Sequence, residues 1–212
     1  TAPASLVKGF DTVSCQFAFH YFFESPRSLC NILHGIDRLV KQGGHFIATL
    51  FNGHRVLEKV KAVDVGSSTT GTDFLREWRV DGELNAAVKL SKDTALPVYT
   101  PTPENTAAVA RLIGLIQEND RDLTKAYTLA EEFLGPFCGK QIQVFVDTIG
   151  QFHAEWLVDF RLLHHLLSTL GFRMLRDDSF EAYYASFKKK MPQSMESFSF
   201  LYHACVWRRD SV

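Results

Sequence analysis

The sequence has few cysteines, and none of them form a recognisable pair. Cys15, Cys30, Cys138 and Cys205 lie far apart, with no C-x-x-C spacing. This spacing excludes a zinc knuckle and provides no disulfide framework. We expect the four thiols to be reduced and intracellular.

The sequence also lacks an excess of charge and a long apolar run. Its formal net charge is −1, whereas proteins that grip long nucleic acids are usually strongly basic. The balance fits an enzyme that reads one nucleotide end, or an enzyme whose basic face lies on another segment. The apolar runs are too short to cross a bilayer, no secretory signal opens the chain, and no G-x-S-x-G or Walker loop favours a hydrolase or an NTPase. The chain begins Thr-Ala-Pro without an initiator Met, which favours a fragment or a processed chain.

Strand and helix patterns alternate in the first third of the 212 residues. Phe10–Phe17 has the composition of a buried strand. Ser25-Pro26 is a typical helix start, and Gly43-Gly44 is predicted to end that helix. His45–Phe51 follows as a strand, and a short helix is expected over Arg55–Val63. This order predicts a parallel α/β sheet.

Later segments are less regular. Residues 97–138 are predicted to be an insertion or lid, with two helices between 104 and 134. One or two strands are expected over Glu77–Leu90. Further strands are expected over Lys140–Thr148 and Phe198–Trp207, and another is expected to start at Phe172. An apolar helix is expected over Leu157–Leu170 and a polar one over Ala182–Lys190. The last two strands should pair antiparallel at a sheet end.

Three separated segments carry a resemblance to a known family. They are FDTVSCQFAFHYFFES with GGHFIATLFN, then the Glu155-Trp156-Leu157-Val158 motif at the start of the apolar helix, then ESFSFLYHACVWRR. Together they resemble the mRNA cap guanine-N7 methyltransferases. The Q-x-x-x-H-Y spacing is what separates this family from other methyltransferases.

The resemblance implies a class I methyltransferase-like fold, with a Rossmann-like, mostly parallel sheet and helices on both faces. Residues 1–212 would form one domain, the C-terminal portion of a cap methyltransferase. The family opens its sheet with an acidic-Gly-x-Gly loop that holds S-adenosylmethionine, and no such loop precedes Phe10. The chain is therefore expected to lack the first strand and glycine loop, and by itself to bind S-adenosylmethionine weakly or not at all.

The resemblance assigns roles to five residues. Gln16 and Tyr21 would contact S-adenosylmethionine, and His20, Glu155 and Tyr202 would contact the cap. Guanine presents hydrogen-bond donors at N1 and N2, and a carboxylate can accept hydrogen bonds from both. Taken without the resemblance, Glu155 also fits a solvated glutamate at a helix N-terminus, and Tyr202 an ordinary sheet residue. Asn52 reads as a turn or helix-cap residue.

The predicted function is transfer of a methyl group from S-adenosylmethionine to N7 of a GpppN cap. It needs no metal and no general base, because N7 is already a nucleophile and placement of the reactants suffices. The alternative is a non-catalytic methyltransferase-like subunit that supports a capping enzyme. Expected partners are the capped 5′ end of RNA and a fused or associated guanylyltransferase or triphosphatase, with no membrane. The expected location is the nucleus for a cellular eukaryotic protein and the cytoplasm for a viral one.

Overall fold

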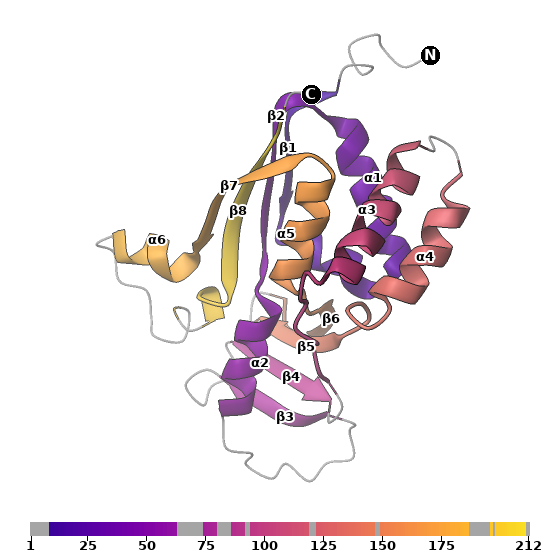
Figure 1. Cartoon of the computed structure of the whole chain (residues 1–212). Helices are drawn as coiled ribbons and strands as arrows, with labels where there is room; N and C mark the ends of the chain where they lie inside the picture. The colour runs from indigo at the N-terminus through magenta and orange to yellow at the C-terminus, as the bar shows by residue number, and fades with distance from the viewer. Residues whose placement is uncertain are drawn as a thin grey trace.

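A computed structural model describes residues 9–62, 74–79, 86–91, 94–118, 122–146, 149–186, 196 and 198–210. Within these residues the chain forms two four-stranded sheets. Helices lie against one side of the first sheet, and the second sheet lies below it in Figure 1. Residues 66–73, whose sequence GSSTTGTD predicts a flexible loop, lie outside the described residues.

The first sheet has the order β1-β2-β8-β7. Its strands are β1 (Phe10–Gln16), β2 (Val40–Phe51), β8 (Tyr202–Arg209) and β7 (Phe172–Ser179). β1 and β2 are parallel, and β8 is antiparallel to both of its neighbours. Three strands therefore run one way and β8 is reversed between them. The α/β class is confirmed, as is the antiparallel pairing of the last two strands.

The helix α1 (Pro26–Leu39) starts as predicted and ends earlier than predicted. The Ser25 hydroxyl accepts a hydrogen bond from the Ser28 backbone N–H at 3.1 Å, with Pro26 in the first turn. The helix stops at Leu39, and Gly43-Gly44 lies inside β2. Gly43 has φ of +74°, and a Cβ on Gly44 would lie 2.9 Å from a backbone oxygen. The glycines therefore form an irregular stretch of β2, where its register with β1 shifts.

The predicted burial of the first strand is wrong. Most of β1 is exposed, including Phe10 and Gln16. Within the described residues β1 pairs only with β2, so it is an edge strand. Parallel strands are normally covered on both faces, and a strand pattern alone does not report whether a second neighbour is present.

The segment 97–138 packs into the main core. It holds α3 (Pro103–Glu118) and α4 (Thr124–Leu134), close to the predicted positions. Both helices contact α1, and α3 also contacts α5 (Phe160–Thr169). α3 contributes four buried apolar side chains at helical spacing: Val109, Leu112, Ile113 and Ile116. The role of this segment as an insertion or lid stays a prediction.

The second sheet is antiparallel throughout and has the order β3-β4-β5-β6. Its strands are β3 (Phe74–Arg79), β4 (Ala86–Ser91), β5 (Gln141–Val146) and β6 (Phe152–Trp156). The sequence predicts β5, predicts one or two strands where β3 and β4 lie, and misses β6. The remaining elements are the 3₁₀ helix η2 (Phe19–Glu24), α2 (Gly53–Ala62) and α6 (Phe180–Ser186).

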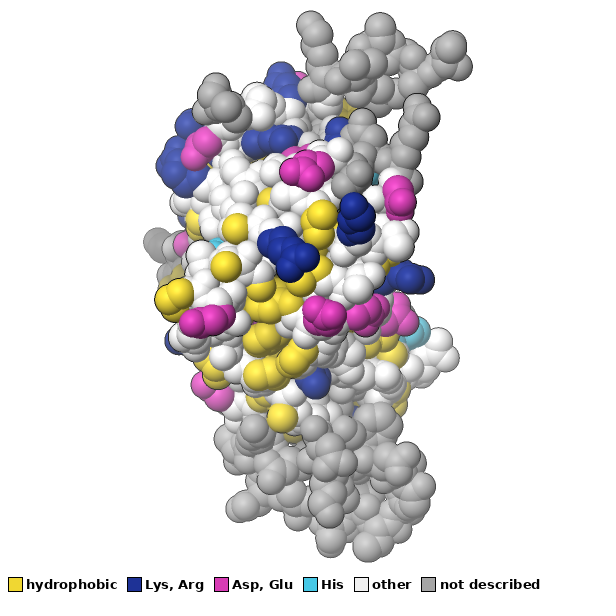
Figure 2. Space-filling view, turned by 45° about the vertical axis from the view of Figure 1, so that its right-hand side comes forward, with side chains coloured by type: hydrophobic (Ala, Val, Ile, Leu, Met, Phe, Trp, Pro, Cys, Tyr) yellow, Lys and Arg dark blue, Asp and Glu magenta, His cyan; other side chains and the backbone are white. Residues whose placement is uncertain are grey.

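Surface charges of both signs are interspersed on the face shown in Figure 2. Lys, Arg, Asp and Glu side chains surround apolar ones there, without an extended basic area among the residues drawn in colour. This face offers no broad surface for a polyanion. Of the described helices, none is both long and apolar enough to span a membrane.

Candidate functional site

The ends of β1 and β2, the start of β8 and the helix η2 meet at one edge of the first sheet. Because β1 and β2 are parallel, Gln16 and Phe51 end at the same edge of the sheet. β8 is antiparallel, so its first residue, Tyr202, pairs with Phe51 at that edge. η2 follows β1 directly and carries His20 and Tyr21. Ligands of α/β proteins commonly bind at this edge.

A close contact brings β6 to the same place. The Gly53 N–H donates to the Val158 carbonyl at 3.0 Å, and the Asn52 N–H donates to the Leu201 carbonyl at 3.0 Å. A Cβ on Gly53 would lie 2.7 Å from the Val158 oxygen and 2.8 Å from Leu96 Cδ2. Only glycine allows the end of β2 to approach the segment after β6 this closely. Asn52 also accepts from the Arg55 N–H at 3.3 Å, as its predicted capping role requires.

Glu155 lies on the strand β6 and not at a helix start, which corrects the sequence expectation. It pairs with Ile142 of β5. The helix α5 begins later, because the Asp159 side chain caps it by accepting from the Leu162 N–H at 2.8 Å. Glu155 is 9% exposed, which rules out a solvated glutamate at a helix N-terminus.

Glu155 and His20 form a buried polar pair. Glu155 Oε2 lies 3.3 Å from His20 Nε2, and His20 is 1% exposed. The pair lacks hydrogen-bond alignment: within the described part of the chain, both His20 ring nitrogens and Glu155 Oε2 have no hydrogen-bond partner. Buried polar groups are nearly always paired, so these atoms are available to a ligand.

Burial opposes charge on both members of the pair. It lowers the pKa of His20 to about 4, so the imidazole is neutral at pH 7. Burial also raises the pKa of Glu155 to about 7, partly offset by a hydrogen bond with Tyr21. The carboxyl is therefore near half ionised at neutral pH and can be driven to its charged form by donors on a ligand.

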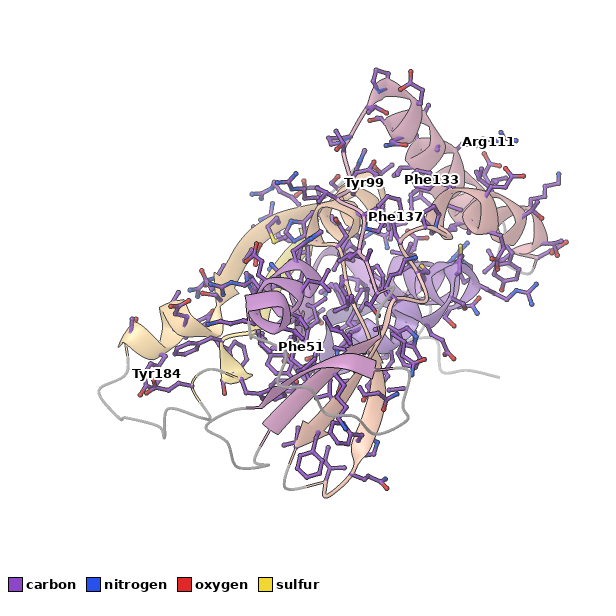
Figure 3. All side chains as sticks on the ribbon, turned by 90° about the horizontal axis from the view of Figure 1, so that it is seen from below. Phe51, Tyr99, Arg111, Phe133, Phe137 and Tyr184 are labelled. Carbon is purple, nitrogen blue, oxygen red and sulfur yellow. The ribbon has the colours of Figure 1, made fainter. Side chains whose placement is uncertain are left out.

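Aromatic rings surround this pair. The His20 ring lies 4.5 Å from Tyr21 and 5.5 Å from Phe51. Tyr202 stacks on Phe51 at 4.0 Å, and Figure 3 places Phe51 beside the second sheet. Burial raises the pKa of Tyr202, and the nearby Glu155 and Tyr21 raise it further. The structure thus brings His20, Tyr21, Glu155 and Tyr202 together from three elements, η2, β6 and β8.

Gln16 lies at the exposed border of this group. Its Oε1 accepts from the Thr49 hydroxyl at 2.9 Å, and its Nε2 donates to the Ser14 hydroxyl at 2.8 Å. The side chain is fixed at the end of β1, facing solvent and not the buried pair. Tyr21 is 39% exposed, and its ring lies 4.5 Å from that of His20.

Phe17 is a candidate that the sequence reasoning missed. It has φ of +53°, which is unusual for a residue other than glycine. Its N–H donates to the Thr49 hydroxyl at 2.8 Å, and its ring meets Tyr202 edge-on at 5.1 Å while remaining 49% exposed. Such backbone conformations are held where the surroundings require them. Its place directly after Gln16 in the motif was the only available signal.

Comparison with known proteins supports the sequence resemblance. Residues 5–78 match the family model described as the mRNA (guanine-N(7))-methyltransferase domain. The resemblance to the cap guanine-N7 methyltransferase family is confirmed. The matched residues carry β1, η2, α1 and β2, hence Gln16, His20 and Tyr21, and do not reach Glu155 or Tyr202.

Two relatives carry the name "mRNA cap guanine-N(7) methyltransferase". The protein of Drosophila melanogaster is 36% identical over 61 residues, covering 29% of this chain and 14% of the relative. The protein of Caenorhabditis briggsae is 30% identical over 125 residues, covering 58% and 33%. The matched part of the chain thus spans a third or less of these relatives.

Among solved structures, the CcbJ methyltransferase from Streptomyces caelestis is similar to 96% of this chain and 59% of its own, with a TM-score of 0.43 and 11% identity. Because this score is low, the fold assignment rests on the strand order described above. No group of three or more His, Cys, Asp or Glu side chains within the described residues could hold a metal ion.

Proposed function

We propose that this chain holds the cap guanine in an mRNA cap guanine-N7 methyltransferase. One observation supports this proposal. Glu155 and His20 lie side by side in a buried position, and Glu155 Oε2 and both His20 ring nitrogens have no hydrogen-bond partner among the described residues. Guanine offers donors at N1 and N2 to the carboxylate and an acceptor at O6 to the imidazole. These buried atoms of Glu155 and His20, which lack partners within the described part of the chain, suit this edge of the base.

The chain's own residues would act by placement. N7 carries a lone pair, and the sulfonium of S-adenosylmethionine supplies the electrophilic methyl group. The methyl carbon moves from sulfur to N7, so no base has to remove a proton. Glu155, His20 and Tyr202 would fix the guanine ring, which sets the direction of N7 toward the donor. Phe17 and Tyr202 offer aromatic surface next to it.

Gln16 and Tyr21 would meet S-adenosylmethionine. Both are exposed at the edge of the site. This position suits S-adenosylmethionine bound next to the buried Glu155–His20 pair. Weak binding of S-adenosylmethionine by this chain alone stays a prediction. The associated guanylyltransferase or triphosphatase and the cellular location are likewise proposals.

Titration with a cap analogue tests the proposal directly. GpppA is added to the chain and to the Glu155→Gln variant, and binding is followed by calorimetry. Loss of charge-assisted hydrogen bonds should weaken binding about 10- to 100-fold. The exposed Glu132 of α4 supplies the matched control, Glu132→Gln, which should bind as the unchanged chain does.

The inosine analogue IpppA sharpens this test because it lacks the 2-amino group. The unchanged chain should prefer GpppA to IpppA, and the Glu155→Gln variant should lose that preference. Equal affinity of Glu155→Gln and the unchanged chain for GpppA would overturn the cap-binding role. A chain that binds GpppA and contributes no methylation when supplied with its catalytic partner would favour the non-catalytic alternative.

A further inference from the structure

The helix α5 has two distinct faces. Its leucines at 162, 163, 166 and 167 are buried in the core. The opposite face, formed by Arg161, His164, His165 and Ser168, lines a cavity of about 730 Å³. The far wall comes from Tyr99 and Pro101 and from the start of β7. None of the five candidate cap or cofactor residues lines this cavity, which we call the α5 groove.

The α5 groove carries an excess of positive charge. Two guanidinium groups, Arg161 and Arg173, line it together with a single carboxylate, Asp210. Arg173 Nε lies 3.4 Å from Asp210 Oδ1. Arg161 has no hydrogen bond or ion pair with any described residue. One full positive charge on the helix is therefore left for an anionic ligand.

Further donors lie beside Arg161. The Tyr99 hydroxyl lies 2.6 Å from His165 Nδ1. Burial, with Asp159 nearby, raises the pKa of Tyr99, so the hydroxyl keeps its proton and can donate it to Nδ1. A neutral His165 then carries its own proton on Nε2. Arg161 and His165 are four residues apart and share one helix face.

Apart from Thr106, the remaining lining side chains are apolar. Pro101, Phe172, Met174 and Trp207 border the groove. The indole N–H of the buried Trp207 has no hydrogen-bond partner among the described residues. The volume lies within the range of about 300–1,000 Å³ that small-molecule sites occupy. A ligand that fits combines an anionic group rich in acceptors with a flat apolar part.

We propose that the α5 groove binds a nucleotide, with its phosphate on Arg161 and His165 and its base along the apolar wall. The source can be an internal nucleotide of an RNA strand or a free nucleotide, which share this chemistry. Taking RNA as the source rests on the proposed function. The groove itself is separate from the cap site, so the two sites can be tested separately.

Binding of an uncapped RNA pentanucleotide carrying a fluorescent label tests the groove. Anisotropy gives the Kd, and unlabelled AMP serves as competitor. Arg161→Gln should weaken binding about tenfold, since it removes one charge-assisted contact. The slope of log Kd against log salt concentration should fall by about one. Urea unfolding confirms that the variant is folded.

The matched control is Arg111→Gln. Arg111 is exposed on α3, and Figure 3 shows it apart from Tyr99 at the outer side of the helices. This variant, and Glu155→Gln in the cap site, should bind the pentanucleotide as the unchanged chain does. Displacement by AMP would support a site for single nucleotides, and binding of the pentanucleotide alone would support a site for the RNA strand.

Three outcomes would overturn the groove proposal. The first is no binding of either probe at millimolar concentration. The second is an equal loss in Arg161→Gln and Arg111→Gln, which would indicate general charge attraction. The third is an equal loss in Glu155→Gln, which would place uncapped RNA in the cap site. Each leaves the GpppA titration as an independent measure of cap binding.

Discussion

Glu155 and Asp159 are two buried carboxylates four residues apart, and they differ in their hydrogen bonding. Asp159 is fully buried and fully bonded: it accepts from the Leu162 N–H at 2.8 Å, the Tyr99 N–H at 3.0 Å and His54 Nε2 at 2.8 Å. Glu155 has an oxygen without a hydrogen-bond partner among the described residues. The comparison separates a carboxylate that holds the structure together from one that is left for a ligand.

Asp159 also explains how Glu155 is positioned. Through His54 it ties the segment after β6 to the start of α2, beside the contact of Gly53 with Val158. Through Tyr99 it ties the same segment to the chain leading into α3. The strand carrying Glu155 is thereby fixed relative to β2, and so relative to His20. Asp159 is a positioning residue for the candidate site.

The largest expected effect comes from Asp159→Ala. Removing this side chain uncaps α5 and leaves the buried Tyr99 N–H unpaired. We expect the free energy of unfolding in urea to fall by about 4 kcal/mol. Asp122→Asn is the control, because Asp122 accepts from the Thr124 N–H in an exposed position and its loss should be small. A similar loss in both variants would contradict the positioning role.

The second effect is a gain in stability for Glu155→Gln that depends on pH. The folded-state pKa of Glu155 is raised from 4.5 to about 7, so the folded state binds more protons than the unfolded state between these values. Stability contributed by this group is therefore lost as pH rises from 4.5 to 7. Relative to the unchanged chain, Glu155→Gln should gain about 2 kcal/mol between pH 5 and pH 8.

Urea unfolding of both proteins at the two pH values measures this gain. His20 must be considered separately, since its pKa is lowered to about 4 and its stability contribution is lost as pH falls below 6.5. Because His20 is present in both proteins, the part of its effect that does not depend on Glu155 cancels in the difference. A difference that does not change with pH, as expected for Glu132→Gln, would refute the buried ionisation of Glu155.

The smallest effect is expected for His54→Ala. The His54 side chain is 31% exposed, and Asp159 keeps its two backbone donors without it. We expect a loss of about 1 kcal/mol. Repeating the substitution in the Asp159→Ala background isolates the pair: the loss should then largely disappear. An unchanged loss would mean that His54 acts through other contacts.

Local patterns predicted most of the elements. Ser25-Pro26 predicted the start of α1, and the apolar spacing in 104–134 predicted two helices, because caps and helical periodicity depend on neighbouring residues. The same reasoning failed at Gly43-Gly44, where φ of +74° serves a strand irregularity instead of a helix end. It also failed for β6, whose pairing with β5 determines its conformation.

The sequence by itself determined the α/β class, the strand ends that carry Gln16 and His20, and the resemblance to cap guanine-N7 methyltransferases. Only the tertiary structure decided that Glu155 lies buried 3.3 Å from His20, that Tyr202 joins them, and that one face of α5 lines a groove. The physical reason is the distance along the sequence over which each interaction acts. Caps and periodicity act between residues close in the chain, whereas these contacts depend on strand pairing and on the close approach of Gly53 to Val158, between segments about a hundred residues apart.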